Sequence, residues 1–70
     1  MRAHVGDRII IESLHPRVAP RIGVIVGVSY PSGRPPYRVR WLIHGHVTLI
    51  IPGPEARLEP FADPSPDETG

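Results

Sequence analysis

The sequence predicts an all-β fold, and two observations carry that prediction. Ten prolines and seven glycines divide the 70 residues into short segments, which is typical of strands joined by tight turns. None of the segments keeps apolar residues at the 3.6-residue spacing of a helix over three turns. We therefore expect five short strands, which cover residues 8–12, 21–29, 37–42, 46–51 and 57–59.

The first two strands are expected where β-branched runs lie between turn residues. A turn at Gly6 leads into the first strand, and a loop with two prolines at residues 13–20 follows it. The second strand contains Gly23 and Gly27. These glycines mark points where a strand bends sharply or where another backbone comes close.

The last three strands are bounded mainly by prolines. Pro35-Pro36 biases the chain toward an extended backbone just before the third strand, in which aromatic and apolar residues alternate with arginines. His44-Gly45 is the simplest two-residue turn into the fourth strand. The fourth strand ends at residues 52–54, and the short fifth strand ends at Pro60.

Five short antiparallel strands at this spacing favour an SH3-like barrel over residues 1–60. Closing the sheet removes edges that so short a chain cannot otherwise cover. A five-stranded OB-like barrel is the alternative, although it usually needs a longer chain and a helix. Residues 61–70 are acidic and rich in proline, so we expect them to form a disordered tail.

The charges divide the chain into a basic body and an acidic end. Residues 1–54 carry seven arginines against two acidic residues, a net charge of +5, whereas residues 55–70 carry one arginine against five acidic residues, a net charge of −4. This asymmetry fits either a basic surface for a polyanion or an end that folds back on its own domain. Lysine is absent, as is typical of a GC-rich coding sequence, so the arginines alone are weak evidence of nucleic-acid binding.

The sequence offers no sign of catalysis or of a bound cofactor. Cysteine is absent, which excludes disulfides and thiolate zinc sites. Nucleophile-elbow and phosphate-loop motifs are also absent, as are paired carboxylates within the predicted barrel. We expect a non-enzymatic protein without a cofactor. We place it in the cytoplasm, because the sequence contains neither a long apolar run nor the pattern of a signal peptide.

Four blocks of the sequence carry a resemblance to a known family. They are residues 1–7, 35–41, 45–46 and 52–56. Over about residues 1–58 the chain resembles a small actinobacterial family of domains of unknown function, number nineteen-eighteen in that series. The resemblance implies a compact five-stranded antiparallel barrel and no activity, cofactor or catalytic residue. Members of that family are typically acidic where this chain has Val24, Gly27 and Val47, so the resemblance implies a more apolar surface here.

Residues 37–51 predict a β-hairpin with two different faces. A two-residue turn at His44-Gly45 places Trp41 opposite Thr48 and Arg40 opposite Leu49. One face is then a core layer that consists of Tyr37, Val39, Trp41, Thr48 and Ile50. The other, which we name the hairpin face, is apolar with an arginine rim and consists of Arg38, Arg40, Leu42, Val47, Leu49 and Ile51.

Three interpretations of the hairpin face are open. The loop at residues 13–20 could cover Leu49 and Ile51. The exposed apolar residues could instead bind another protein or a second copy of this chain, which is the function we expect. The alternative function is nucleic-acid binding, with phosphates on Arg21, Arg34, Arg38 and Arg40 and bases stacked on Tyr37 or Trp41.

The ring side chains of the hairpin have expected positions. Trp41, the single tryptophan, is expected in the core. The ring of Tyr37 is expected to pack while its hydroxyl stays in water. His44 and His46 bracket a glycine and are weak candidates for a shared metal ion. We expect instead that His44 is a solvated turn residue and that His46 donates a hydrogen bond across the hairpin.

Overall fold

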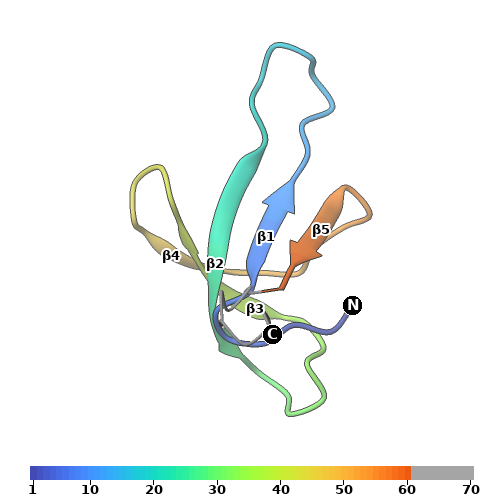
Figure 1. Cartoon of the computed structure of the whole chain (residues 1–70), viewed down its shortest axis with the longest axis vertical. Coiled ribbons are helices and arrows are strands. Elements are labelled where there is room, and N and C mark those ends of the chain that lie inside the picture. Colours follow the sequence, from blue (N-terminus) through green and yellow to red (C-terminus); the bar gives the residue numbers. More distant parts are fainter. Residues whose placement is uncertain (61–70) are drawn as a thin grey trace, which may run out of the picture.

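The computed structural model describes residues 1–60, which form one antiparallel sheet of five strands (Figure 1). The strands are β1 (Arg8–Ile11), β2 (Arg21–Val28), β3 (Tyr37–Trp41), β4 (Val47–Ile50) and β5 (Ala56–Glu59). Each lies within one residue of its expected bounds, and the described part contains no helix, so the all-β prediction is confirmed. Nothing in residues 1–60 has the length and apolar character of a membrane-crossing helix. The expected tail at 61–70 lies outside the described residues.

The strands follow the order β4-β3-β2-β1-β5, which makes β4 and β5 the two edges of the sheet. The long strand β2 pairs with both β1 and β3, and a bulge between Ile25 and Gly27 interrupts its pairing with β3. No hydrogen-bonded ladder joins β4 to β5 within the described residues. The loop between β1 and β2 projects beyond the strands at one end of the molecule (Figure 1).

The two glycines of β2 lie where the sequence predicts close approach or bending. Gly23 pairs with Trp41, and a Cβ at Gly23 would overlap the side chain of Val39 and lie 3.1 Å from the Trp41 ring. Because Gly23 has no side chain, the side chains of Val39 and Trp41 can pack directly against the β2 backbone there. Gly27 lies at the bulge. Both expectations are confirmed.

Most of the core lies on one face of the sheet, although Ile10, which is 5% exposed, follows Ile9 in β1 and points to the other face. The fully buried cluster of the core consists of Ala3, Ile9, Ile25, Tyr37, Val39 and Trp41. Strand β3 shows the expected alternation, since its aromatic and apolar residues are buried and both of its arginines are exposed. Trp41 is only 2% exposed, so its predicted place in the core is confirmed.

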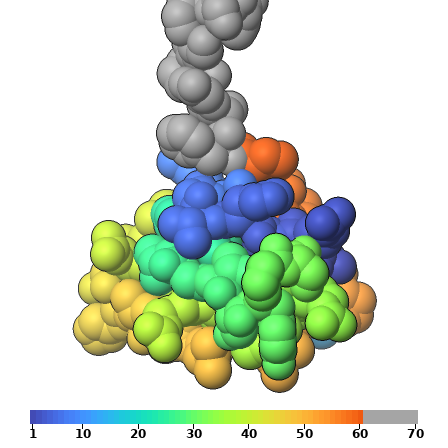
Figure 2. Space-filling view, turned by 90° about the horizontal axis from the view of Figure 1, so that it is seen from below, coloured from blue at the N-terminus to red at the C-terminus, as the bar shows by residue number. Residues whose placement is uncertain are grey.

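The hydroxyl of Tyr37 is buried, contrary to the expectation that it stays in water. It donates a hydrogen bond to the carbonyl of Gly33 at 2.6 Å and lies 3.2 Å from the carbonyl of Met1. The N–H of Ala3 also donates to Gly33, at 2.8 Å. These bonds hold the N-terminal segment against the loop between β2 and β3, and Figure 2 shows the two segments side by side. Local sequence pattern carries no sign of this long-range contact.

The turn between β3 and β4 is longer than expected. The N–H of Trp41 donates to the carbonyl of His46 at 2.9 Å, and the N–H of Gly45 donates to the carbonyl of Trp41 at 2.8 Å, which encloses a four-residue loop. Gly45 has a φ of +76°, a conformation that favours glycine. Arg40 therefore pairs with Val47, two residues away from the predicted register. Because the shift is even, the paired side chains stay on their predicted faces, although Thr48 is exposed and the prediction that it belongs to a core layer is wrong.

Candidate interaction face

The apolar residues of the hairpin face are exposed. The exposed fractions are 53% for Leu42, 45% for Val47, 62% for Leu49 and 78% for Ile51. The loop at residues 13–20, which was one candidate for covering them, instead projects away from the sheet (Figure 1). The interpretation in which this loop buries Leu49 and Ile51 is therefore wrong.

The hairpin face continues onto β2, because strands in register place their side chains in rows across the sheet. One row contains Val24, Arg40 and Val47. The N–H of Leu42 also donates to the carbonyl of Ile22 at 3.0 Å, which extends the β2–β3 ladder by one step. Sequence reasoning missed Ile22 and Val24 as part of this face. Their position follows only from the register of β2 with β3. That register cannot be predicted from the local sequence, because β2 contains Gly23 and a bulge.

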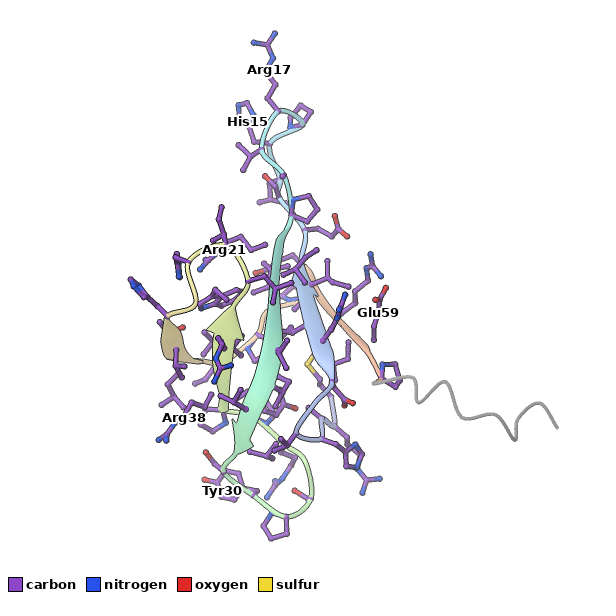
Figure 3. All side chains as sticks on the ribbon, turned by 60° about the vertical axis from the view of Figure 1, so that its left-hand side comes forward. His15, Arg17, Arg21, Tyr30, Arg38 and Glu59 are labelled. Carbon is purple, nitrogen blue, oxygen red and sulfur yellow. The ribbon has the colours of Figure 1, made fainter. Side chains whose placement is uncertain are left out.

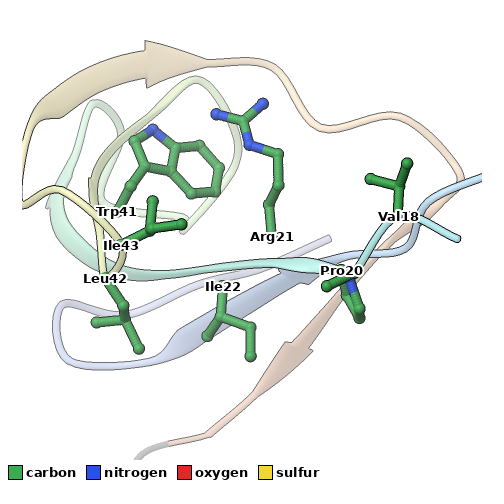
Figure 4. Close-up of a pocket in the computed structure, with 8 residues that line it drawn as sticks. Val18, Pro20, Arg21, Ile22, Trp41, Leu42 and Ile43 are labelled. Carbon is green, nitrogen blue, oxygen red and sulfur yellow. The ribbon is translucent and has the colours of Figure 1, made fainter.

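An apolar groove of about 490 Å³ borders the hairpin face (Figure 4). It lies between the start of β2 and the β3–β4 loop, and it is lined by Val18, Ala19, Pro20, Arg21, Ile22, Trp41, Leu42 and Ile43. The guanidinium of Arg21 lies 4.2 Å from the centre of the Trp41 ring, within the range of a cation–π contact. Ile22 and Leu42 belong to both the groove and the exposed face, so the two surfaces are continuous.

The four arginines proposed for nucleic acid do not form one cluster. Arg38 and Arg40 lie on the hairpin face, and Figure 3 shows Arg38 pointing away from the sheet. Neither has a carboxylate partner within residues 1–60. Arg21 lies over a buried ring at the groove, and Arg34 lies in the β2–β3 loop, 5.3 Å from the ring centre of Tyr30.

The aromatic support expected for nucleic-acid binding is contradicted. Tyr37 is 0% exposed and Trp41 is 2% exposed, so neither ring can stack on a base. The polar atoms of both rings are also engaged. The indole N–H of Trp41 donates to the hydroxyl of Thr48 at 2.7 Å, and the Tyr37 hydroxyl donates to Gly33. Burial raises the pKa of Tyr37 above its ordinary value of 10.0.

The two hairpin histidines stack on each other. Their ring centres are 4.4 Å apart at an angle of 36°, and Nδ1 of His44 accepts a hydrogen bond from the backbone N–H of His46 at 3.1 Å. The expectation that His46 donates a hydrogen bond across the hairpin is wrong, because its backbone carbonyl accepts the cross-hairpin bond from Trp41 while its N–H donates within the turn. Within residues 1–60 no group of three or more histidine, cysteine or acidic side chains gathers closely enough to hold a metal ion.

The buried carboxylate of the described part serves the fold. Asp7 is 7% exposed and accepts a hydrogen bond from the backbone N–H of His4 at 2.8 Å, while its own N–H donates to the carbonyl of His4. The pair closes the turn that precedes β1. Elsewhere, Glu12 and Glu59 both contact Arg57 at 3.2 to 3.3 Å on the exposed side of β5. These acidic residues are therefore engaged in turns and surface ion pairs.

The fold and this face define a small all-β domain with an exposed, apolar hairpin face that is rimmed by arginines. The chain belongs to the family described as "Domain of unknown function (DUF1918)", which it matches over residues 1–58. The predicted resemblance is thereby confirmed.

Its curated relatives carry no assigned function in their names. The chain is 43% identical over 56 residues to "Uncharacterized protein Rv0569" of Mycobacterium tuberculosis strain H37Rv, a match that covers 80% of this chain and 64% of that relative. It is 38% identical over 56 residues to "Uncharacterized protein Rv2302" of the same strain, and here 80% of this chain and 70% of the relative are covered. The chain thus covers less than two thirds of the length of Rv0569. No solved structure matches the chain.

Proposed function

We propose that this domain is a non-enzymatic binding module whose hairpin face is a contact surface for another protein chain. The observation that carries the proposal is the continuous exposure of Leu42, Val47, Leu49 and Ile51 beside two arginines that have no acidic partner in the described part. Contiguous exposed apolar area of this kind marks interaction sites in soluble proteins. An apolar centre with a charged rim is also the general arrangement of protein interfaces.

Two finer expectations belong to the same proposal. The first is that the sheet curves into a partly open SH3-like barrel, in which β4 and β5 form no ladder with each other in the described residues. It is supported by the β2 bulge and by a strand order that brings the last strand beside the first. The second is a cytoplasmic location, which is supported by the absence of cysteine from the 70 residues. Both leave the hairpin face as the surface presented to a partner.

Nucleic-acid binding is the alternative, and the two unpaired arginines of the hairpin face favour it. Arg38 and Arg40 point to the same side of β3, where two guanidinium groups could contact successive phosphates. A titration with generic single- and double-stranded DNA and RNA at low salt tests it. This alternative predicts affinity that falls steeply with salt and that is weakened when both arginines are replaced by alanine. Binding that Arg38→Ala with Arg40→Ala leaves unchanged, or the absence of binding, contradicts it.

A photo-crosslinking amino acid placed at position 49 of the full chain tests the proposed function in the source cell. We expect discrete crosslinked protein bands from position 49. The matched control position is Leu14, which is 96% exposed but lies in the β1–β2 loop, away from the hairpin face. Introducing Leu42→Glu beside the crosslinker should weaken the bands. Identical bands from positions 49 and 14, or none from position 49, would contradict the proposal.

A further inference from the structure

Strand β4 is an open edge of the sheet, and the hydrogen-bond pattern fixes which of its backbone groups face outward. The N–H of Trp41 donates to the carbonyl of His46, so the backbone groups of residue 46 point toward β3. Alternate residues of an antiparallel strand point to opposite sides. The backbone groups of Val47 and Leu49 therefore point away from β3, toward the side of β4 that pairs with no other described strand. The same alternation, carried one residue past the end of β4, gives Ile51 the same direction. Figure 1 shows β4 at the edge opposite β5.

This edge lacks the features that usually prevent strands from pairing with another chain. The strand sequence Val47–Ile50 contains no charged residue, no proline and no bulge. The other edge, β5, differs. Its residues Arg57 and Glu59 are charged and joined by an ion pair, whereas a proline ends both strands, Pro60 directly after β5 and Pro52 two residues after β4. Of the two edges in the described part, β4 is therefore the one without charged residues and the more open to pairing.

The same three residues that offer outward backbone groups also carry exposed apolar side chains. Val47, Leu49 and Ile51 lie on the hairpin face, on one side of the sheet. A partner strand that pairs with this edge thus gains backbone hydrogen bonds and apolar contacts together. An occupant that satisfies both must present alternate apolar residues at the same spacing.

We infer that the occupant is a second copy of this chain, whose β4 pairs antiparallel with β4 of the first around a two-fold axis at Leu49. The inference rests on the proposed function and names its partner. In this register Leu49 of one copy lies opposite Leu49 of the other, and Val47 lies opposite Ile51. All three apolar residues of each copy then meet an apolar residue, and the outward backbone groups exchange about six hydrogen bonds.

Neighbouring registers use the edge less completely. A shift of two residues in one direction places Gly45 opposite Ile51, and the same shift in the other direction places Gly53 opposite Val47. Each leaves an apolar side chain facing a glycine. Only the register centred on Leu49 matches the whole apolar set.

The arginines of the hairpin face do not oppose this pairing. Arg38 lies in register with Leu49, so the two copies of Arg38 would be separated by three strand spacings, about 14 Å. That separation exceeds the Debye length of about 8 Å at physiological ionic strength, so salt screens the repulsion. The arginines would border a central apolar cluster, as in the rim of an interface.

Disulfide trapping tests both the pairing and its register, because the native chain contains no cysteine. Directly opposed residues in a hydrogen-bonded pair have Cα atoms about 5.5 Å apart, within the range of a disulfide. Single Leu49→Cys chains should therefore form covalent dimers under mild oxidation. Two copies of Ile51→Cys should not, since their Cα atoms would lie about 13 Å apart along the strands. Leu14→Cys controls for random collision at an exposed site.

We expect Leu49→Cys to dimerise at least about tenfold faster than either control, because a fixed register raises the effective concentration of the two thiols. Equal rates in all three variants, or no dimer from Leu49→Cys in a folded chain, would overturn the inference. Amide hydrogen exchange in the unmodified chain gives a second readout that does not depend on the variants folding. The amides of Val47 and Leu49 should become more protected as concentration rises, and concentration-independent exchange at both would also overturn it.

The same comparison separates this inference from the proposed function. If the photo-crosslinker at position 49 captures a different protein while Leu49→Cys stays monomeric, the second copy is wrong as the partner and the contact surface stands. If position 49 captures nothing and Leu49→Cys stays monomeric, both fail.

Discussion

Replacing Tyr37 by phenylalanine should cost about 1 kcal/mol of unfolding free energy. The substitution keeps the buried ring and removes only the hydroxyl that donates to Gly33 at 2.6 Å. In the variant the Gly33 carbonyl still accepts a hydrogen bond from the N–H of Ala3, at 2.8 Å, so no buried acceptor is left without a donor. The loss is therefore that of one net hydrogen bond, about 0.5 to 1.5 kcal/mol, rather than the larger penalty of an unsatisfied group. In a domain of this size, 1 kcal/mol lowers the melting temperature by roughly 4 to 8 °C.

Urea denaturation followed by circular dichroism measures this loss, and Tyr30→Phe is the matched control. Tyr30 is 48% exposed, so its substitution should change stability by less than about 0.5 kcal/mol. A Tyr37→Phe chain as stable as Tyr30→Phe would refute the reasoning.

The pKa of Tyr37 adds a second test with a defined sign. Burial raises this pKa above 10.0 in the folded chain, so above pH 10 the unfolded chain loses the proton first. The stabilising effect is complete below the unfolded pKa and is lost as pH rises through the folded pKa. Native stability should therefore fall above pH 10, and Tyr37→Phe should reduce that fall. An unchanged fall in the variant would contradict the assignment.

Three further predictions concern stability, each measured by the same urea denaturation. Gly23→Ala should destabilise by about 1 to 3 kcal/mol, since its Cβ would crowd Trp41 and the neighbouring strand, whereas Gly45→Ala should cost about 1 kcal/mol because its φ is +76°. If Gly23→Ala loses less unfolding free energy than Gly45→Ala, the argument that a side chain at position 23 is crowded is wrong. Thr48→Val should cost about 1 kcal/mol by removing the acceptor of the Trp41 indole N–H, and no loss would show that water replaces it. Arg57→Ala should change stability by at most about 1 kcal/mol, because both of its ion pairs are exposed, and a larger loss would contradict this.

The positions of the strands and the composition of the two hairpin faces could be predicted from the sequence. Alternation of arginine with aromatic and apolar residues in β3 is a local signal, and it fixes which side chains share a face. The pairing register of β3 with β4 was harder to predict, because His44-Gly45 resembles a two-residue turn. In the structure Gly45 instead ends a four-residue loop. The paired side chains nevertheless lie on the predicted faces, because the actual register differs from the predicted one by two residues, an even number.

Features that depend on contacts distant in sequence could not be predicted. The Tyr37 hydroxyl finds its acceptor in the loop before β3 and lies near the N-terminal residue, an arrangement without a local pattern. Likewise, Ile22 joins the hairpin face only through its register with Leu42. The open edge of β4 follows from the strand order of the whole sheet. Topology, rather than residue pattern, decides each of these features.

Light scattering coupled to size-exclusion chromatography, over a series of concentrations, tests most directly whether β4 is a contact surface for a second copy. The native chain should approach twice its mass of 7.7 kDa as concentration rises. Leu49→Glu should remain monomeric, whereas Leu14→Glu, an equally drastic change at an exposed site outside the hairpin face, should dimerise like the native chain. A native chain that stays monomeric at every concentration, or a Leu49→Glu chain that dimerises as well as the native one, would contradict the account.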